Sequence, residues 1–123
     1  MMVGPTSIEI STRQLEAATI VDVNGDITLR STPEVRKVLL DLLRDKRTPR
    51  VIVNLLKVRY IDSAGVASLV EALRVSRDMS RGFALFGLSH AARQVLELTR
   101  LTKVFEIHED EQSALSAEGA SQS

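Results

Sequence analysis

Residues 60–66 read Tyr60-Ile61-Asp62-Ser63-Ala64-Gly65-Val66, and this segment decides how the rest of the chain is interpreted. It follows an apolar segment typical of a strand and opens a segment with apolar residues at helical spacing: Val66, Leu69, Val70 and Leu73. Ser63 therefore falls at or near a helix N-cap, where backbone N–H groups lack partners and the helix dipole is positive. A phosphate on Ser63 would meet hydrogen-bond donors there as well as solvent. Ser63 is either a helix cap or a phosphorylation site, and the heptapeptide alone favours the cap.

The segment from about Pro33 to Arg44 is the clearest helix upstream of this motif. It has proline in its first turn and a capping-box spacing between Ser31 and Glu34. Its apolar residues form one stripe made of Val35, Val38, Leu39, Leu42 and Leu43. Thr48-Pro49 ends the helix, and Val51 to Leu56 follows as a nearly continuous apolar run, typical of a strand buried on both faces. We expect it to be the central strand.

The beginning of the chain has the pattern of a hairpin. Ser7 to Ser11 and Ala18 to Val23 both carry apolar residues with a period near two, and a short polar turn around Arg13 to Glu16 separates them. We interpret residues 24–30 as a connecting loop. An alternative is a tight turn at Asn24-Gly25 followed by a further strand.

Strand and helix patterns also alternate after the Ser63 helix, which should end near Met79 to Gly82. The expected elements are a strand at Phe83 to Gly87, a helix capped by Ser89 that runs through Leu98, a strand at Val104 to Ile107 and a final helix that begins near Glu109 to Glu111. The sequence thus predicts an α/β sandwich with a mixed, mostly parallel sheet and helices packed against it. Residues 1–116 would form one domain, and residues 117–123 a disordered tail.

Composition excludes several classes of function. The 123 residues include sixteen basic and sixteen acidic residues, interleaved along the chain, so we expect no nucleic-acid partner. Cysteine is absent, which excludes thiolate chemistry and fits a reducing compartment. No apolar run approaches the ~20 residues needed to cross a bilayer, and Met1 to Ile10 lacks the pattern of a signal peptide. We expect a cytoplasmic protein without a membrane partner.

Other candidate sites in the sequence are weaker than Ser63. His90 and His108 lie in different expected elements without a neighbouring cysteine, so we expect no metal site. Asp26 and Asp62 are more typical of solvated loop carboxylates than of cation ligands. A serine hydrolase would need glycine at the position of Ile61, two residues before the nucleophile, so hydrolase chemistry is not expected.

At this point the chain resembles the STAS domain family, and within it the bacterial anti-sigma-factor antagonists, over roughly Ile8 to Leu115. The heptapeptide is similar to the family's Asp-Ser-Ser/Thr-Gly phosphorylation segment, in which the serine after the aspartate is the acceptor. Gly25-Asp26-Ile27-Thr28 is similar to a family loop that lies beside that segment. Phe86-Gly87-Leu88 and the residues from Val95 to Phe105 are similar to the closing strand, helix and strand.

The resemblance implies a partner-switching protein with no cofactor and no catalytic activity of its own. Unphosphorylated Ser63 would allow binding to an anti-sigma factor that is also a serine kinase, phosphorylation would end the complex, and a serine phosphatase would reset it. The implied contact surface consists of Asp26, Thr28, Asp62, Ser63, Ala64 and Gly65. We interpret Gly65 as a position where a partner's backbone can approach closely, so that alanine there would leave the fold intact.

Two residues depart from the family pattern. Ala64 replaces a second hydroxyl residue, and Thr28 stands where the family loop often has an aspartate. STAS domains of transporters and lipid-transport assemblies do not use the phosphorylation cycle, so a non-phosphorylated scaffold subunit is the alternative function. A weak homodimer is also left open.

Overall fold

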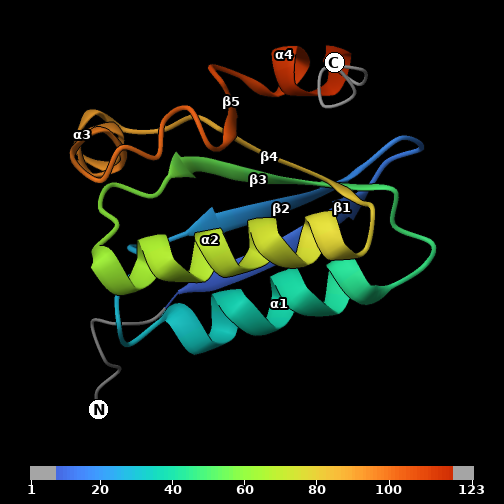
Figure 1. The fold of residues 1–123 in the computed structure, drawn as a ribbon, viewed down its shortest axis with the longest axis horizontal. Coiled ribbons are helices and arrows are strands. Elements are labelled where there is room, and N and C mark those ends of the chain that lie inside the picture. The colour runs from blue at the N-terminus through green and yellow to red at the C-terminus, as the bar shows by residue number, and fades with distance from the viewer. Residues whose placement is uncertain (1–7, 118–123) are drawn as a thin grey trace.

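Five strands lie side by side in the order in which they occur in the chain (Figure 1). The structure, a computed structural model, describes residues 8–117. Its elements are β1 (Glu9–Gln14), β2 (Thr19–Asn24), α1 (Thr32–Arg44), β3 (Arg50–Lys57), α2 (Ser63–Asp78), β4 (Gly82–Phe86), α3 (His90–Leu98), β5 (Glu106–His108) and α4 (Glu111–Ser116). β1 pairs antiparallel with β2, and the remaining neighbours pair in parallel. The predicted mixed, mostly parallel α/β sheet is confirmed.

The two faces of the sheet are covered differently. α1 and α2 lie together across one face, and α4 lies on the opposite side (Figure 1). In β3, Val51, Val53 and Leu55 belong to the larger core shared with α1 and α2, while Ile52 belongs to a smaller cluster with Ala114 of α4. All four β3 side chains have no exposed surface. β3 is therefore the central strand that its apolar sequence predicted.

The hairpin turns two residues later than expected. Arg13 and Gln14 belong to β1, and the turn runs from Leu15 to Ala18, where the Leu15 N–H donates to the Ala18 carbonyl at 2.8 Å. The predicted turn around Arg13 to Glu16 is wrong because the end of β1 is an exposed edge strand, so its polar residues resemble a loop. The predicted loop at residues 24–30 is confirmed from residue 25 on, apart from a single-residue bridge described below, whereas Asn24 is the last residue of β2.

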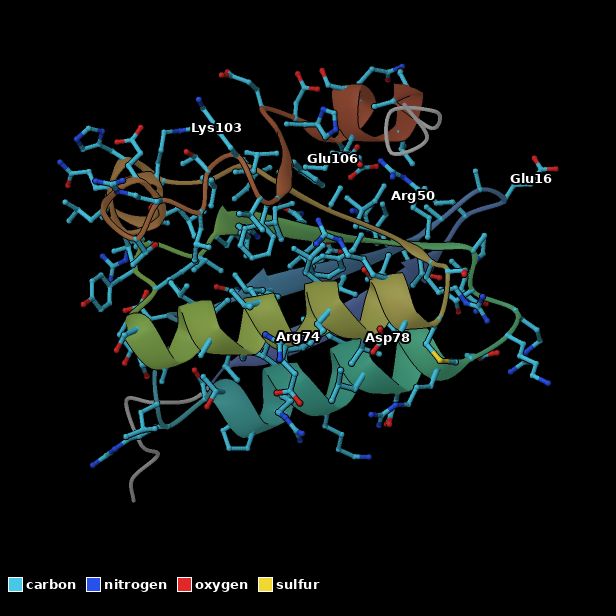
Figure 2. The ribbon with its side chains drawn as sticks, viewed as in Figure 1. Glu16, Arg50, Arg74, Asp78, Lys103 and Glu106 are labelled. Carbon is cyan, nitrogen blue, oxygen red and sulfur yellow. The ribbon has the colours of Figure 1, made fainter. Side chains whose placement is uncertain are left out.

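The C-terminal segment is fastened to the sheet by one buried arginine. Arg50 donates from Nη2 to Glu106 Oε2 at 2.7 Å and to the Ala114 carbonyl at 2.8 Å, and His108 Nε2 lies 2.6 Å from the same Glu106 oxygen. Figure 2 shows Arg50 and Glu106 beside each other below the C-terminal helix. Burial alone raises the pKa of Glu106, but the hydrogen bonds and charges of Arg50 and His108 outweigh it and leave that pKa lowered.

The helix ends agree with the sequence in part. Ser89 caps α3 as predicted, because its Oγ accepts from the Ala92 N–H at 3.0 Å. The capping box predicted for α1 is wrong, since the Ser31 hydroxyl makes no cap hydrogen bond. β5 begins two residues later than predicted. Within the described residues, no helix has the length and apolar composition needed to span a bilayer. Ser7 and the tail residues 118–123 lie outside the described residues.

Candidate functional site

The loops that follow β2 and β3 meet beside the N-terminus of α2. Ile27 and Ile61 form an isolated parallel bridge between these loops. The Ile27 N–H donates to the Tyr60 carbonyl at 3.1 Å, and the Asp62 N–H donates to the Ile27 carbonyl at 3.1 Å. Both isoleucine side chains are fully buried. The heptapeptide and the loop from Gly25 to Thr28 therefore lie side by side, as the family resemblance implied.

Asp62 joins these two loops through both oxygens of its carboxylate. As the N-cap of α2, it accepts from the Gly65 N–H through Oδ1 at 2.8 Å. Its Oδ2 accepts from the Leu29 N–H at 3.1 Å. One carboxylate thus fixes the start of α2 and holds the first loop against it.

Ser63 is the first residue of α2, one position after the cap, and its side chain is exposed. Among residues 8–117 its hydroxyl has no hydrogen-bond partner, because the capping role belongs to Asp62. Ser68, one turn later, is 6% exposed and its Oγ donates to the Gly65 carbonyl at 2.7 Å. The two serines of α2 nearest its start therefore differ sharply in access to a modifying enzyme.

Gly65 is buried beneath this surface, and the interpretation of Gly65 as open to a partner's backbone is wrong. A Cβ at this position would lie 2.3 Å from the Ile27 carbonyl oxygen and 2.7 Å from Cγ2 of Ile61. The first atom belongs to backbone that the Ile27–Ile61 bridge holds in place. Gly65 is required because the chain's own loop packs against the helix here.

Ser31 stabilises the first loop from inside. Its side chain is 1% exposed, accepts from the Thr28 N–H at 2.9 Å and donates to the Asp26 carbonyl at 2.8 Å. This explains why it does not cap α1. The sequence placed Ser31 near the helix start correctly, but spacing alone does not show which way a hydroxyl turns.

The other predicted contact residues surround Ser63 at different depths. Asp26 is exposed, whereas Thr28, Asp62 and Ala64 are half-buried. Two exposed apolar residues that the sequence argument did not select, Leu29 and Tyr60, flank the same loops. Leu29 is 71% exposed although its N–H is held by Asp62. No group of three or more metal-ligating side chains occurs among the described residues.

Comparison with known proteins agrees with this geometry. The family model described as the STAS domain matches residues 9–114. An anti-sigma-B factor antagonist of Listeria monocytogenes is 32% identical over 101 residues, covering 82% of this chain and 87% of that protein.

Two solved structures share the fold. An anti-sigma factor antagonist from Mycobacterium paratuberculosis has a TM-score of 0.84 at 23% identity, covering 94% of this chain and 97% of that chain. The phosphorylated form of SpoIIAA, a Bacillus cell fate determinant, has a TM-score of 0.68 at 15% identity, covering 88% and 97%. The family match and the Listeria relative carry the assignment: the chain belongs to the STAS domain family.

Proposed function

We propose that this chain is an anti-sigma-factor antagonist whose binding to its partner is ended by phosphorylation of Ser63. The observation that carries the proposal is the exposed Ser63 hydroxyl at the first position of α2, left without a partner among residues 8–117. The antagonists among its relatives support the class of partner. A phosphorylated form of a protein with the same fold supports the type of control.

The partner in this proposal is an anti-sigma factor that is also a serine kinase. The kinase transfers the γ-phosphoryl group of ATP to Ser63 Oγ, which loses its proton, and ADP leaves. A serine phosphatase then hydrolyses the phosphate ester and restores the hydroxyl. The chain itself catalyses nothing and acts in the cytoplasm. The proposed contact surface consists of Asp26, Thr28, Leu29, Asp62, Ser63 and Ala64, supported from beneath by Gly65.

Electrostatics explains why phosphorylation would separate the complex. A phosphoserine carries about −1.5 to −2 charges and would stand next to the carboxylate of Asp62. Like charges ~4 Å apart repel by a few kcal/mol at a near-surface dielectric. Attraction between the phosphate and the positive N-terminus of α2 contributes only ~0.3–1 kcal/mol. Solvent relieves this repulsion in the free protein. A closely packed interface excludes that solvent, so the complex loses stability.

The test combines phosphosite mapping with binding measurements. Incubation with ATP and the kinase should add a single phosphate, located on Ser63 by peptide mass spectrometry. Ser63→Ala should bind the anti-sigma factor and remain bound in the presence of ATP. Ser63→Asp should fold normally and lose most of its affinity in titration calorimetry. Ser68→Ala is the matched control, because its buried hydroxyl should not be phosphorylated.

Three results would contradict the proposal. One is a phosphate on Ser68, Thr28 or Ser89 with Ser63 unmodified. Another is a Ser63→Asp protein that binds as tightly as the wild type. The third is a phosphoprotein whose amide NMR spectrum changes throughout the sheet rather than around residues 62–69, because the switch would then lie in the fold rather than at the interface. Absence of any phosphate would favour a scaffold subunit.

A further inference from the structure

β1 forms a long, regular and exposed edge of the sheet. Its six residues pair with β2 in an unbroken register, with neither proline nor a bulge. The opposite edge strand, β5, has only three residues. Within residues 8–117, no strand pairs with the outer side of β1. Such an edge presents backbone hydrogen-bonding groups that a second strand can use.

The turn of the hairpin determines which backbone groups of β1 point outward. The Leu15 N–H donates to the Ala18 carbonyl, so this pair is hydrogen-bonded. Hydrogen-bonded and non-hydrogen-bonded pairs alternate along an antiparallel ladder. The N–H and C=O groups of Ile10, Thr12 and Gln14 therefore face away from β2, while those of Ser11 face toward it.

The sequence of β1 is complementary to itself when reversed. When two β1 strands pair antiparallel with Ser11 facing Ser11, Glu9 lies opposite Arg13 and Ile10 lies opposite Thr12. We propose that β1 pairs antiparallel with β1 of a second copy of this chain, with the two-fold axis at Ser11. Ile10 and Thr12 then form hydrogen-bonded pairs across the axis, and Glu9 faces Arg13 of the second copy. Moving the axis to Thr12 would instead place Arg13 opposite Ser11 and leave the charges unmatched.

Arg13 retains some capacity for this contact. It already binds Asp22 at 2.6 and 2.8 Å and Glu111 at 3.2 and 2.7 Å, which uses four of its five N–H groups. One N–H on Nη1 remains, and the side chain is 42% exposed. Two carboxylates already neutralise this guanidinium, so a third gains little energy. The pairing is therefore weak and concentration-dependent, as expected for a small interface.

Symmetry fixes the shape of the resulting dimer. The two-fold axis of an antiparallel strand pair is perpendicular to the sheet, so the ten strands form one continuous sheet. Both copies then carry α1 and α2 on the same face. The loops that hold Ser63 lie at opposite ends of the dimer, because β2 runs in opposite directions in the two copies. Pairing through β1 consequently leaves both Ser63 sites open.

The absence of cysteine provides a direct test of this register. Two facing residues in a non-hydrogen-bonded pair have Cα atoms ~4.5 Å apart, a separation that a disulfide accepts. Ser11→Cys in the 123-residue chain should form a disulfide-linked dimer under mild oxidation, in much higher yield than Thr12→Cys. Gln94→Cys, exposed on α3, is the control for random collision. Equal yields for Ser11→Cys and Gln94→Cys would overturn the proposal, and preferential linkage of Thr12→Cys would overturn the register.

Sedimentation equilibrium tests the pairing without a cross-link. The wild type should show a dimer that grows with protein concentration, and Thr12→Pro should remain monomeric, since proline removes an outward N–H without breaking the ladder with β2. Ile10→Pro removes the other outward N–H of these hydrogen-bonded pairs and should also remain monomeric, so it is the second variant if Thr12→Pro misfolds. A wild type that is monomeric at millimolar concentration, or a dimer that persists in a folded Thr12→Pro or Ile10→Pro variant, would refute the proposal.

Discussion

Gly65 is a residue at which helix propensity and packing make opposite predictions. Alanine is a better helix former than glycine by about 1 kcal/mol, so the sequence alone favours a tolerated or stabilising Gly65→Ala change. The structure places the new Cβ 2.3 Å from the Ile27 carbonyl oxygen. We therefore expect Gly65→Ala to lower the free energy of unfolding by about 1–3 kcal/mol, the usual cost of overpacking. Urea denaturation measures this value.

A matched substitution separates the clash from propensity. Ala67 is exposed in the same helix, so Ala67→Gly should cost only the ~0.5–1 kcal/mol of a glycine in a helix interior. If Gly65→Ala is as stable as the wild type, the loop around Ile27 must be able to retreat from α2. Such a result would remove the argument that Gly65 supports the contact surface through packing.

Single residues around Ser63 differ in how far the sequence predicts their roles. The position of Ser63 at a helix start was predictable from the apolar spacing behind it. The sequence did not predict which of Asp62 and Ser63 caps α2, because aspartate and serine are both good N-caps. The structure shows that the cap is Asp62. The Ser31 hydroxyl can either cap α1 or bond within its own loop, and the structure shows it bonded to Thr28 and Asp26. The burial of Gly65 depends on Ile27, in the loop that follows β2, far from Gly65 in the sequence. No local pattern encodes such contacts.

The start of α2 depends on the Asp62 carboxylate, which accepts two hydrogen bonds, one from α2 and one from the loop after β2. Asp62→Asn keeps a cap oxygen for the Gly65 N–H but cannot also accept from the Leu29 N–H through an amide NH₂. Asp62→Ala loses both bonds and should cost about 0.5–2 kcal/mol for the cap alone. We expect Asp62→Asn to have a smaller effect on stability than Asp62→Ala. Faster amide hydrogen exchange at Leu29 should appear in both variants.

The cap of α4 offers a control for this prediction. Asp110 accepts from the Ser113 N–H at 2.8 Å as the N-cap of α4. Asp110→Asn should therefore change the exchange of α4 alone and leave Leu29 protected. If Asp62→Asn leaves the exchange of Leu29 unchanged, the bond between Asp62 and Leu29 does not hold the first loop in solution.

The elements differ in how well the sequence predicts them. α1 and α2 follow from apolar stripes, and β3 follows from a run buried on both faces. The ends of β1 and β5 were misplaced because these edge strands are largely exposed or only half-buried, so their residues lack the apolar alternation of a core strand. The packing of α4 by Arg50 and Arg13 was not predicted either, since single basic residues carry no signal of their distant partners.

At the scale of the whole molecule, the buried pair of Arg50 and Glu106 makes the C-terminal attachment sensitive to acid. Because the folded-state pKa of Glu106 is lowered, its contribution to stability is present above the unfolded value of about 4.3 and is lost as pH falls through the folded value. Glu106→Gln should destabilise the protein near neutral pH. The difference from the wild type should narrow in acid. Urea denaturation over a pH series measures both effects.

An exposed ion pair serves as the reference for this experiment. Glu71 pairs with Arg36 at 2.7 Å, and that hydrogen bond lowers the pKa of Glu71, but both side chains are largely accessible to water. Glu71→Gln should therefore have little effect at any pH, as is usual for surface pairs. If Glu106→Gln behaves like Glu71→Gln, the attachment of β5 and α4 does not depend on the charge of Glu106.

The order of the strands has a consequence for synthesis on the ribosome. The strands β1 to β5 are neighbours in the sheet in the order in which they are synthesised. Each new strand therefore pairs with a strand that has already left the ribosome. No strand has to wait for a later one to be inserted between its neighbours. The long-range contact of Arg13 with Glu111, 98 residues apart, is an exception that forms only after α4 has emerged. A nascent chain can therefore assemble the sheet progressively, and α4 covers the face with Ile20, Ile52 and Phe86 after the five strands have emerged.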